Sequence, residues 1–146
     1  MRAFKRQFAA LVSFALISCA TDGQLSMVAD VDPIRWREAA EFTLLNSDTL
    51  SVRDISIFAR YQPTGERIDS LPLHIVTVAP NKARVVEQFT LQLKNRVGDQ
   101  WRRRVFYEAP YRHEVKLRQS GEYKILIYPQ SPQSGVEAIG IAVKSR

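Results

Sequence analysis

Apolar and polar residues alternate along several segments of this chain, and this alternation restricts its fold more than any other feature. Every second residue is apolar in DISIFARY (residues 54–61), EQFTLQLK (87–94) and GEYKILIYPQ (121–130). A period of two places these residues on one face of an extended chain, which is typical of a half-buried β-strand. The residues on the three apolar faces are Ile55, Ile57, Ala59, Tyr61, Phe89, Leu91, Leu93, Tyr123, Ile125 and Ile127.

Further strand-like segments and regularly spaced turns predict an all-β fold. LPLHIVTVAP (71–80) and EAIGIAVKS (137–145) are rich in β-branched residues, and EFTLL, RRVFYEA and HEVKL are shorter candidates. Turn residues separate these segments at Pro63–Glu66, Ala79–Lys82, Val97–Gln100, Gln119–Glu122 and Pro129–Gly135. Because no long segment has a 3.6-residue period, we expect an antiparallel β-sandwich of the jelly-roll or immunoglobulin-like type. Gly140, inside the last strand-like segment, indicates a bulge or a close approach of another backbone segment.

The first 18 residues have the layout of a secretory signal peptide. Arg2, Lys5 and Arg6 precede an apolar run at residues 8–17, and no acidic residue lies among them. The run is shorter than the ~20 apolar residues that a membrane-spanning helix needs. A buried core helix is the alternative, but a basic segment that starts with methionine favours the export signal.

The end of this signal resembles a bacterial lipobox. In Leu16-Ile17-Ser18-Cys19, a cysteine follows an aliphatic residue and a small one. The resemblance implies that the Cys19 thiol is diacylated, that the chain is cleaved before Cys19, and that the new amino terminus is acylated. Cys19 is the only cysteine, so it has no partner for an internal disulfide. No aspartate directly follows Cys19, and by resemblance to known lipoprotein sorting this implies that the lipid anchor holds the chain on the outer membrane, with the leaflet left open.

The expected domain organisation has three parts. Residues 1–18 form the signal peptide, residues 19–30 a lipidated tether of small and polar residues, and residues 31–146 a single β-sandwich domain. Removal of the signal leaves 128 residues, which suits one domain. It also removes three of the cations behind the net charge of +6 and leaves +3. We therefore expect no nucleic-acid partner.

No strong catalytic signature occurs in the sequence. His74 lies in an apolar run and His113 in a basic segment, and neither has a cysteine or a second histidine at ligand spacing. A nucleophile elbow, a phosphate-binding loop and a dinucleotide fingerprint are also missing from it. We therefore expect no metal, no cofactor and no enzymatic activity. A hydrolase is the least favoured alternative, because the carboxylates are scattered and the sequence does not show which of them meet.

The most distinctive segment for binding is WRRRVFYEAPYRH, at residues 101–113. Aromatic and arginine residues are enriched in binding hot spots, so the segment is a candidate surface for a glycan, an acidic protein or lipid headgroups. The alternative is a strand on which core aromatics alternate with solvated arginines. The candidate surface consists of Trp101, Arg102, Arg103, Arg104, Tyr107, Tyr111 and Arg112.

The order of several motifs resembles that of a known family. The lipobox is followed by Trp36, ISIFARY, PLHIVTVAP, VGDQW, SGEYKILIYPQ and GVEAIGIAVK. This order is similar to that of the gliding-motility-associated lipoprotein GldH family of Bacteroidota. In that family a Gly-x-Tyr strand and a glycine-containing ending are typical, and here residues 121–123 and 135–141 occupy those places.

The resemblance implies a non-enzymatic envelope lipoprotein with envelope protein partners. Its role would be that of an accessory or structural component of a gliding-motility or secretion-related assembly. The alternative is a surface-exposed module that binds a glycan or a protein through the aromatics and arginines of residues 101–112. The glycan version predicts that the aromatic rings are exposed in a row on one sheet face.

Overall fold

Eight β-strands make up the described part of the chain. The structure is a computed structural model, and it describes residues 23–93 and 105–146. Those two ranges contain no helix, and so none that is long and apolar enough to cross a membrane. The strands are β1 (Gln24–Asp30), β2 (Ala40–Asn46), β3 (Val52–Tyr61), β4 (Ser70–Val78), β5 (Arg84–Gln92), β6 (Val105–Lys116), β7 (Gly121–Pro129) and β8 (Val136–Ser145).

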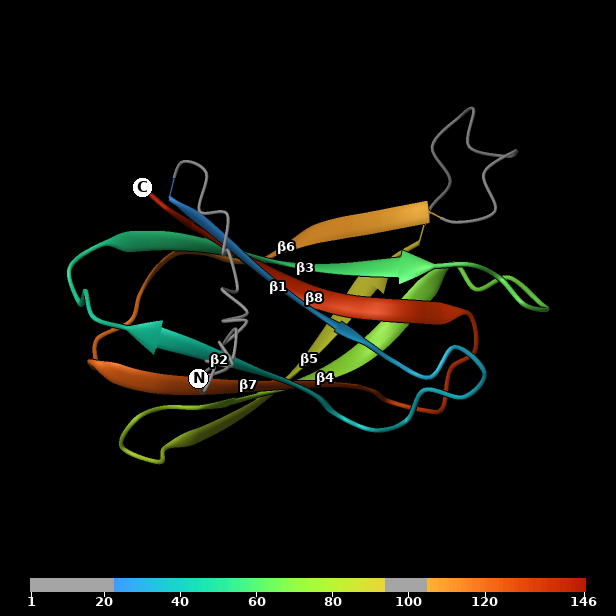
Figure 1. Ribbon diagram of the computed structural model, residues 1–146, viewed down its shortest axis with the longest axis horizontal. Helices are drawn as coiled ribbons and strands as arrows, with labels where there is room; N and C mark the ends of the chain where they lie inside the picture. The colour runs from blue at the N-terminus through green and yellow to red at the C-terminus, as the bar shows by residue number, and fades with distance from the viewer. Residues whose placement is uncertain (1–22, 94–104) are drawn as a thin grey trace, which may run out of the picture.

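The strands form two antiparallel sheets that pack against each other (Figure 1), with the orders β1-β8-β3-β6 and β2-β7-β4-β5. The pairs β1–β8, β2–β7, β3–β6 and β4–β5 are those of one long hairpin with its turn between β4 and β5. Rolling up this hairpin creates the further pairs β3–β8 and β4–β7. The arrangement is that of an eight-stranded jelly roll. The predicted antiparallel β-sandwich is therefore confirmed, and the strand order is the jelly-roll one.

The core lies between the two sheets and consists of the apolar faces that the sequence indicates. Of the ten residues on the three alternating faces, nine are buried and Phe89 is half-buried. β2 alternates buried and exposed residues along its whole length, and β3 alternates buried and half-buried ones. Ile57, Leu73 and Ile127 have no exposed surface at all. Burial of alternate residues is thus the basis of the fold, as the period of two predicts.

The prediction that residues 19–30 form a tether is wrong from Gln24 onward. Residues 24–30 form β1, and each of them pairs with β8, from Gln24 opposite Lys144 to Asp30 opposite Ala138. β1 is an edge strand with mostly exposed residues, and only Met27 and Ala29 pack partly against the core. Leu25, Met27 and Ala29 do alternate with the other residues, but the alternation is short and Val28 interrupts it on the outer face. The sandwich therefore includes β1 and does not begin at Val31.

β6 is one long edge strand where the sequence suggests two short ones. The parts of these two candidates that lie in β6, residues 105–109 and 113–116, join through residues 110–112. Pro110 has no N–H to donate and is tolerated at the edge of a sheet. The register of β6 against β3 shifts twice, on either side of Ile55, and Glu114 has a positive φ of 51°. Proline and bulges both hinder pairing with a further strand, so this edge of the sheet is protected.

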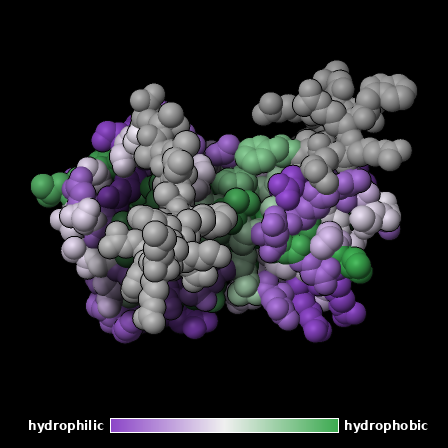
Figure 2. All heavy atoms as spheres, in the orientation of Figure 1, coloured by the Kyte–Doolittle hydropathy of each residue, from purple (hydrophilic) through white to green (hydrophobic). Residues whose placement is uncertain are grey.

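β8 is covered on its outer side at Ala138, Gly140 and Ala142, where its own side chains are small. A Cβ on Gly140 would come within 2.2 Å of Phe58 Cζ and 2.5 Å of the Met27 carbonyl oxygen, so Phe58 lies directly over the glycine. Phe58 also packs against Phe106, with ring centroids 5.1 Å apart. Figure 2 shows a band of hydrophobic atoms across the middle of the molecule, where β3 and β8 pass. The close approach predicted for Gly140 is therefore confirmed.

Replacing Gly140 by valine should lower the free energy of unfolding by about 2–3 kcal/mol, because the new side chain must displace Phe58 and the β1 backbone. Gly65→Ala is the matched control, since a Cβ there meets nothing within 4 Å. It should change stability by no more than about 0.5 kcal/mol. Chemical denaturation of the two variants measures the difference, and equal stabilities would contradict the packing of Phe58 on Gly140.

Candidate functional site

Only part of the predicted binding surface lies within the described residues. Cys19 and residues 101–104 lie outside them, so the lipid anchor and the role of the arginine run stay predictions. Tyr107, Tyr111 and Arg112 all belong to β6. The structure brings two of these three residues together and separates the third.

Tyr107 is a core residue. It is only 8% exposed, it packs in the main core, and its hydroxyl accepts a hydrogen bond from Arg67 Nη2 at 2.9 Å. Its neighbour Phe106 is 59% exposed on the other face of the sheet. Since successive residues of a strand face opposite sides, these two rings do not form an exposed row. The prediction that Tyr107 contributes to an exposed binding surface is therefore wrong.

Tyr111 and Arg112 meet at a seam between two edge strands. β5 is the edge of one sheet and β6 the edge of the other, and the two strands lie in contact. The Tyr111 hydroxyl and the Arg112 guanidinium each donate a hydrogen bond to a different carboxylate oxygen of Glu87 on β5. The guanidinium carbon lies 5.0 Å from the centroid of the Tyr111 ring, and Phe89 packs edge-on against that ring at 5.5 Å. We call Glu87, Tyr111 and Arg112 the Glu87 cluster.

The Glu87 cluster lines one side of an apolar pocket between the sheets, which we call the seam pocket. Its volume is about 160 Å³. Leu44, Ile55 and Tyr123 form its floor and belong to a small core cluster that is separate from the main core. The other lining residues are Thr77, Val85, Val115, Leu117 and Ile125. The pocket is therefore apolar inside and polar on one side of its rim.

The pocket exists because the sandwich opens along β5. Leu91, Phe89, Glu87 and Val85 are the inward positions of this strand, opposite alternate residues of β4. Leu91 is fully buried, Phe89 and Glu87 are half-buried, and Val85 is 52% exposed. The sheets thus diverge towards the turn between β4 and β5, and the inward face of β5 becomes reachable from solvent there.

One wall of the seam pocket is fixed by a polar network. Arg53 is 9% exposed and donates hydrogen bonds to Asn46 Oδ1 at 2.6 Å and to the Asp48 carbonyl at 3.2 Å. The amide of Asn46 donates to the carbonyls of Leu117 and Gln119, at 2.9 and 2.7 Å. Since Leu117 lines the pocket, this network holds the lining in place. This network therefore fixes the Leu117 wall of the pocket.

The three polar groups at the rim fix one another's protonation. Burial acts to raise the pKa of Glu87, but the hydrogen bonds from Tyr111 and Arg112 and the Arg112 charge outweigh it, so the pKa lies below its ordinary value. Burial, followed by the hydrogen bond and charge of Glu87, raises the pKa of Tyr111 to about 12. At neutral pH the cluster is therefore an ionised Glu87 between a neutral phenol and a guanidinium, and both Glu87 oxygens are occupied.

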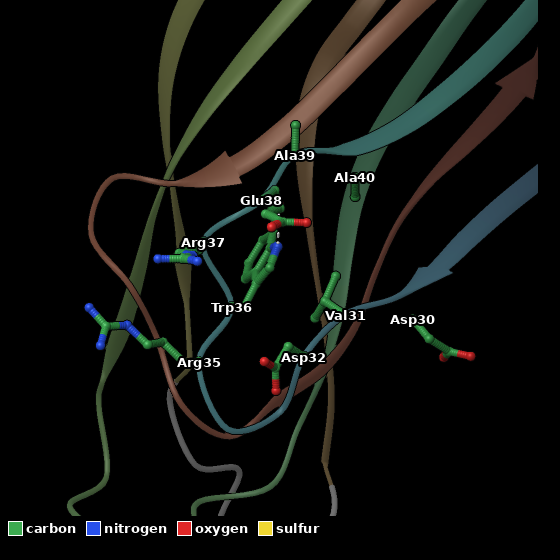
Figure 3. Close-up of a pocket in the computed structure, with 9 residues that line it drawn as sticks. All are labelled: Asp30, Val31, Asp32, Arg35, Trp36, Arg37, Glu38, Ala39 and Ala40. Atoms are coloured by element: carbon green, nitrogen blue, oxygen red, sulfur yellow. Dashed lines mark hydrogen bonds between the residues drawn. The ribbon is translucent and has the colours of Figure 1, made fainter.

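A second hollow, of about 280 Å³, surrounds Trp36 at the opposite end of the sandwich (Figure 3). The Trp36 backbone exchanges two hydrogen bonds with Gln133, and its indole N–H donates to the Glu38 carbonyl at 2.7 Å. Figure 3 shows Arg35 and Arg37 on one side of the indole. Trp36 is only 2% exposed, so the ring closes the end of the core and is not presented to a ligand.

Neither histidine lies in a metal site. His113 Nδ1 lies 2.9 Å from Asp54 Oδ1, in an exposed network with Arg146, and His74 packs against Tyr128 with ring centroids 5.2 Å apart. Over residues 23–93 and 105–146, no group of three or more histidine, cysteine, aspartate or glutamate side chains is placed to hold a metal ion.

The seam pocket is the feature that the sequence did not reveal. The sequence contains one indication of it: Glu87 is two residues before Phe89 and four before Leu91, so it lies on the same apolar face of the strand. A carboxylate on such a face needs a partner. Its partners come from β6, 24 and 25 residues further along the chain, and only the fold brings them close.

No known protein-family model matches this chain, and no curated protein matches it either. A jelly roll hosts many unrelated functions, so the fold alone does not assign one. The function must therefore be argued from the site.

Replacing Glu87 by glutamine should lower the free energy of unfolding by about 1–2 kcal/mol at pH 7, because Tyr111 and Arg112 lose a charged partner. The depressed pKa of Glu87 means that its contribution is present above the ordinary glutamate value of about 4.3 and is lost as the pH falls through the folded value. Denaturation between pH 7 and pH 3 should show the two stabilities converging in acid. Glu66→Gln, in an exposed loop, is the control, and a gap that stays constant with pH would contradict the assignment.

Proposed function

We propose that this chain is a non-enzymatic lipoprotein of the cell envelope, anchored through Cys19, that acts by binding other envelope proteins. The position of β1 carries the proposal. β1 begins at Gln24, five residues after Cys19, and pairs with β8 along its whole length. Five residues span at most about 18 Å. A lipid on Cys19 would therefore hold the end of the sandwich that bears Gln24 close to the bilayer.

The lipobox resemblance supports the anchor itself. A modified Cys19 would carry two or three acyl chains, and stable anchoring takes more than one chain. A thiol with no second cysteine in the sequence is free for this modification. Ala20 and Thr21 follow Cys19 without an aspartate, which supports the outer membrane as the location.

The resemblance to the GldH family supports a role in an assembly. In this proposal the chain is an accessory or structural component of gliding-motility or secretion-related machinery. The Glu87 cluster fits binding better than catalysis, because its members satisfy one another, whereas a general base needs an oxygen free for its substrate.

A binding module for a glycan or a protein is the second proposal. The burial of Tyr107 weakens the glycan version, since Tyr107 and Tyr111 face inward and Phe106 alone of the phenylalanine and tyrosine rings of β6 lies on the outer face. Tyr111 and Arg112 at the rim of the seam pocket favour the protein version, since tyrosine and arginine are common at the centres of protein interfaces.

Replacing Cys19 by alanine should abolish lipidation. Metabolic labelling with an alkyne analogue of palmitate in the native bacterium should label the wild-type chain and leave Cys19→Ala unlabelled. Ser18→Ala is the matched control, because it keeps the cysteine and a small residue before it. Label on Cys19→Ala, or none on the wild-type chain, would rule out the anchor.

Crosslinking in the native envelope, followed by recovery of the tagged chain, should yield one defined set of envelope proteins with the wild type. The same set should be missing with Cys19→Ala, because the unanchored domain no longer meets its partners at the membrane. If no specific protein is recovered with the wild type, the assembly role fails, and glycan binding becomes the better explanation.

A further inference from the structure

We infer that the seam pocket is a docking site for one apolar side chain of a partner protein, presented within an acidic segment. The inference deepens the binding role proposed above and does not depend on the lipid at Cys19. It rests on the size of the pocket, the exposed cations beside it and the ion pair that already occupies its rim.

The size of the pocket fits a single side chain. Its volume is about 160 Å³, close to the roughly 150 Å³ of a cavity that holds one benzene molecule. Pockets that enclose a whole small ligand usually measure about 300–1,000 Å³. A leucine or phenylalanine side chain therefore fits the seam pocket, whereas a long acyl chain or a drug-sized molecule exceeds it.

The lining favours an apolar guest that enters from solvent. Leu44, Ile55 and Ile125 at the base of the pocket are at most 6% exposed, whereas Val85 at its entrance is 52% exposed. When a guest enters the pocket, it also covers the exposed Val85 side chain and removes further apolar surface from water. Apolar anchors that fill such pockets provide much of the binding energy in protein interfaces.

The charges beside the pocket favour an acidic segment around that side chain. Arg84 precedes Val85 in the chain, Lys116 lies between Val115 and Leu117, and Arg118 follows Leu117, so each is next to a lining residue in sequence. Arg84 and Lys116 alternate with inward residues, so their side chains leave the outer faces of β5 and β6 beside the pocket and do not line it. All three cations are exposed, and none forms an ion pair with another described residue. Carboxylates of a partner could therefore pair with cations that form no ion pair with another described residue.

The carboxylates of the same segments do not cancel these cations. Glu87 is bonded to Arg112, and Glu114 is bonded to Arg146 at 3.1 Å. The rim thus carries a satisfied ion pair, and the three exposed cations outnumber Glu122, the one other exposed carboxylate next to a lining residue that forms no ion pair with a described residue. Complementary charge of this kind raises association rates and selects among partners.

The test is a methyl NMR titration of the full chain in phosphatidylcholine nanodiscs, with labelled isoleucine, leucine and valine. The probes are three acetylated and amidated pentapeptides, EELEE, EEAEE and KKLKK. EELEE should shift the methyl signals of Leu44, Ile55 and Ile125 and bind about tenfold more tightly than EEAEE. KKLKK should bind more weakly than EELEE, because the flanking cations repel it.

Val85 and Val86 offer a matched pair of variants. They are neighbours on β5 with exposures of 52% and 55%, but only Val85 lines the pocket. Val85→Phe should fill the entrance and abolish the EELEE shifts, whereas Val86→Phe should leave them unchanged. The methyl signals of Ile139 and Ile141, in the main core, show whether each variant is folded.

A charge variant tests the acidic segment without filling the pocket. Arg84→Glu should weaken EELEE severalfold and strengthen KKLKK, whereas Arg35→Glu at the opposite end of the sandwich should change neither. Four results would each overturn the inference. The first two are equal binding of EELEE and EEAEE, and full EELEE binding by a folded Val85→Phe variant. The other two are the lack of a shift with any peptide, and displacement of EELEE by decanoate. EELEE binding by Cys19→Ala separates this result from the anchor, since that variant should bind it as tightly as the wild type.

Discussion

The two sheets are held together by one layer of inward-facing apolar side chains, and every other feature of the structure depends on that contact. The only cysteine, Cys19, can form no internal disulfide, so no such crosslink supports the sandwich. Burying one large aliphatic side chain contributes roughly 1.5–3 kcal/mol, whereas a typical hydrogen bond contributes about 1 kcal/mol net. Residues such as Ile57, Leu73 and Ile127, which are fully buried, therefore decide the stability, and the polar networks decide the details.

The apolar layer is not uniform, and it is least complete along β5, where the Glu87 cluster and the seam pocket lie. Along β5 the inward positions change from a buried leucine to a half-buried phenylalanine, then to Glu87 and finally to an exposed valine. Where the layer thins, Tyr111 and Arg112 close the gap with hydrogen bonds to Glu87. An inward-pointing charge on an edge strand also hinders pairing with a further strand. One residue thus closes the seam, protects an edge and borders a pocket.

The functional proposals follow from two positions in the same fold. β1 places the folded domain within a few residues of Cys19, which would bring the sandwich to the membrane surface. The seam pocket lies between β5 and β6, at the sheet edges opposite β1 and β2. Its lining residue Ile55 lies at the same end of the sandwich as Gln24, because Leu25 and Ile55 both pair with Val143. An anchor at Cys19 would therefore hold the pocket near the membrane surface, where an envelope partner would meet it. The network of Arg53 and Asn46 keeps the Leu117 wall of the pocket in place.

The sequence by itself determined the all-β class, most strand positions and the inward faces of β3, β5 and β7, because a period of two is a local property of an extended chain. It also determined the close approach at Gly140, because glycine within a strand has few other uses. β1 was missed because its apolar residues Leu25, Met27 and Ala29 form only a short alternation among small and polar residues. The Glu87 cluster and the burial of Tyr107 were decided only by the tertiary structure, since they depend on which strands become neighbours when the hairpin rolls up. That choice is made by non-local pairing, which leaves no mark on any one segment.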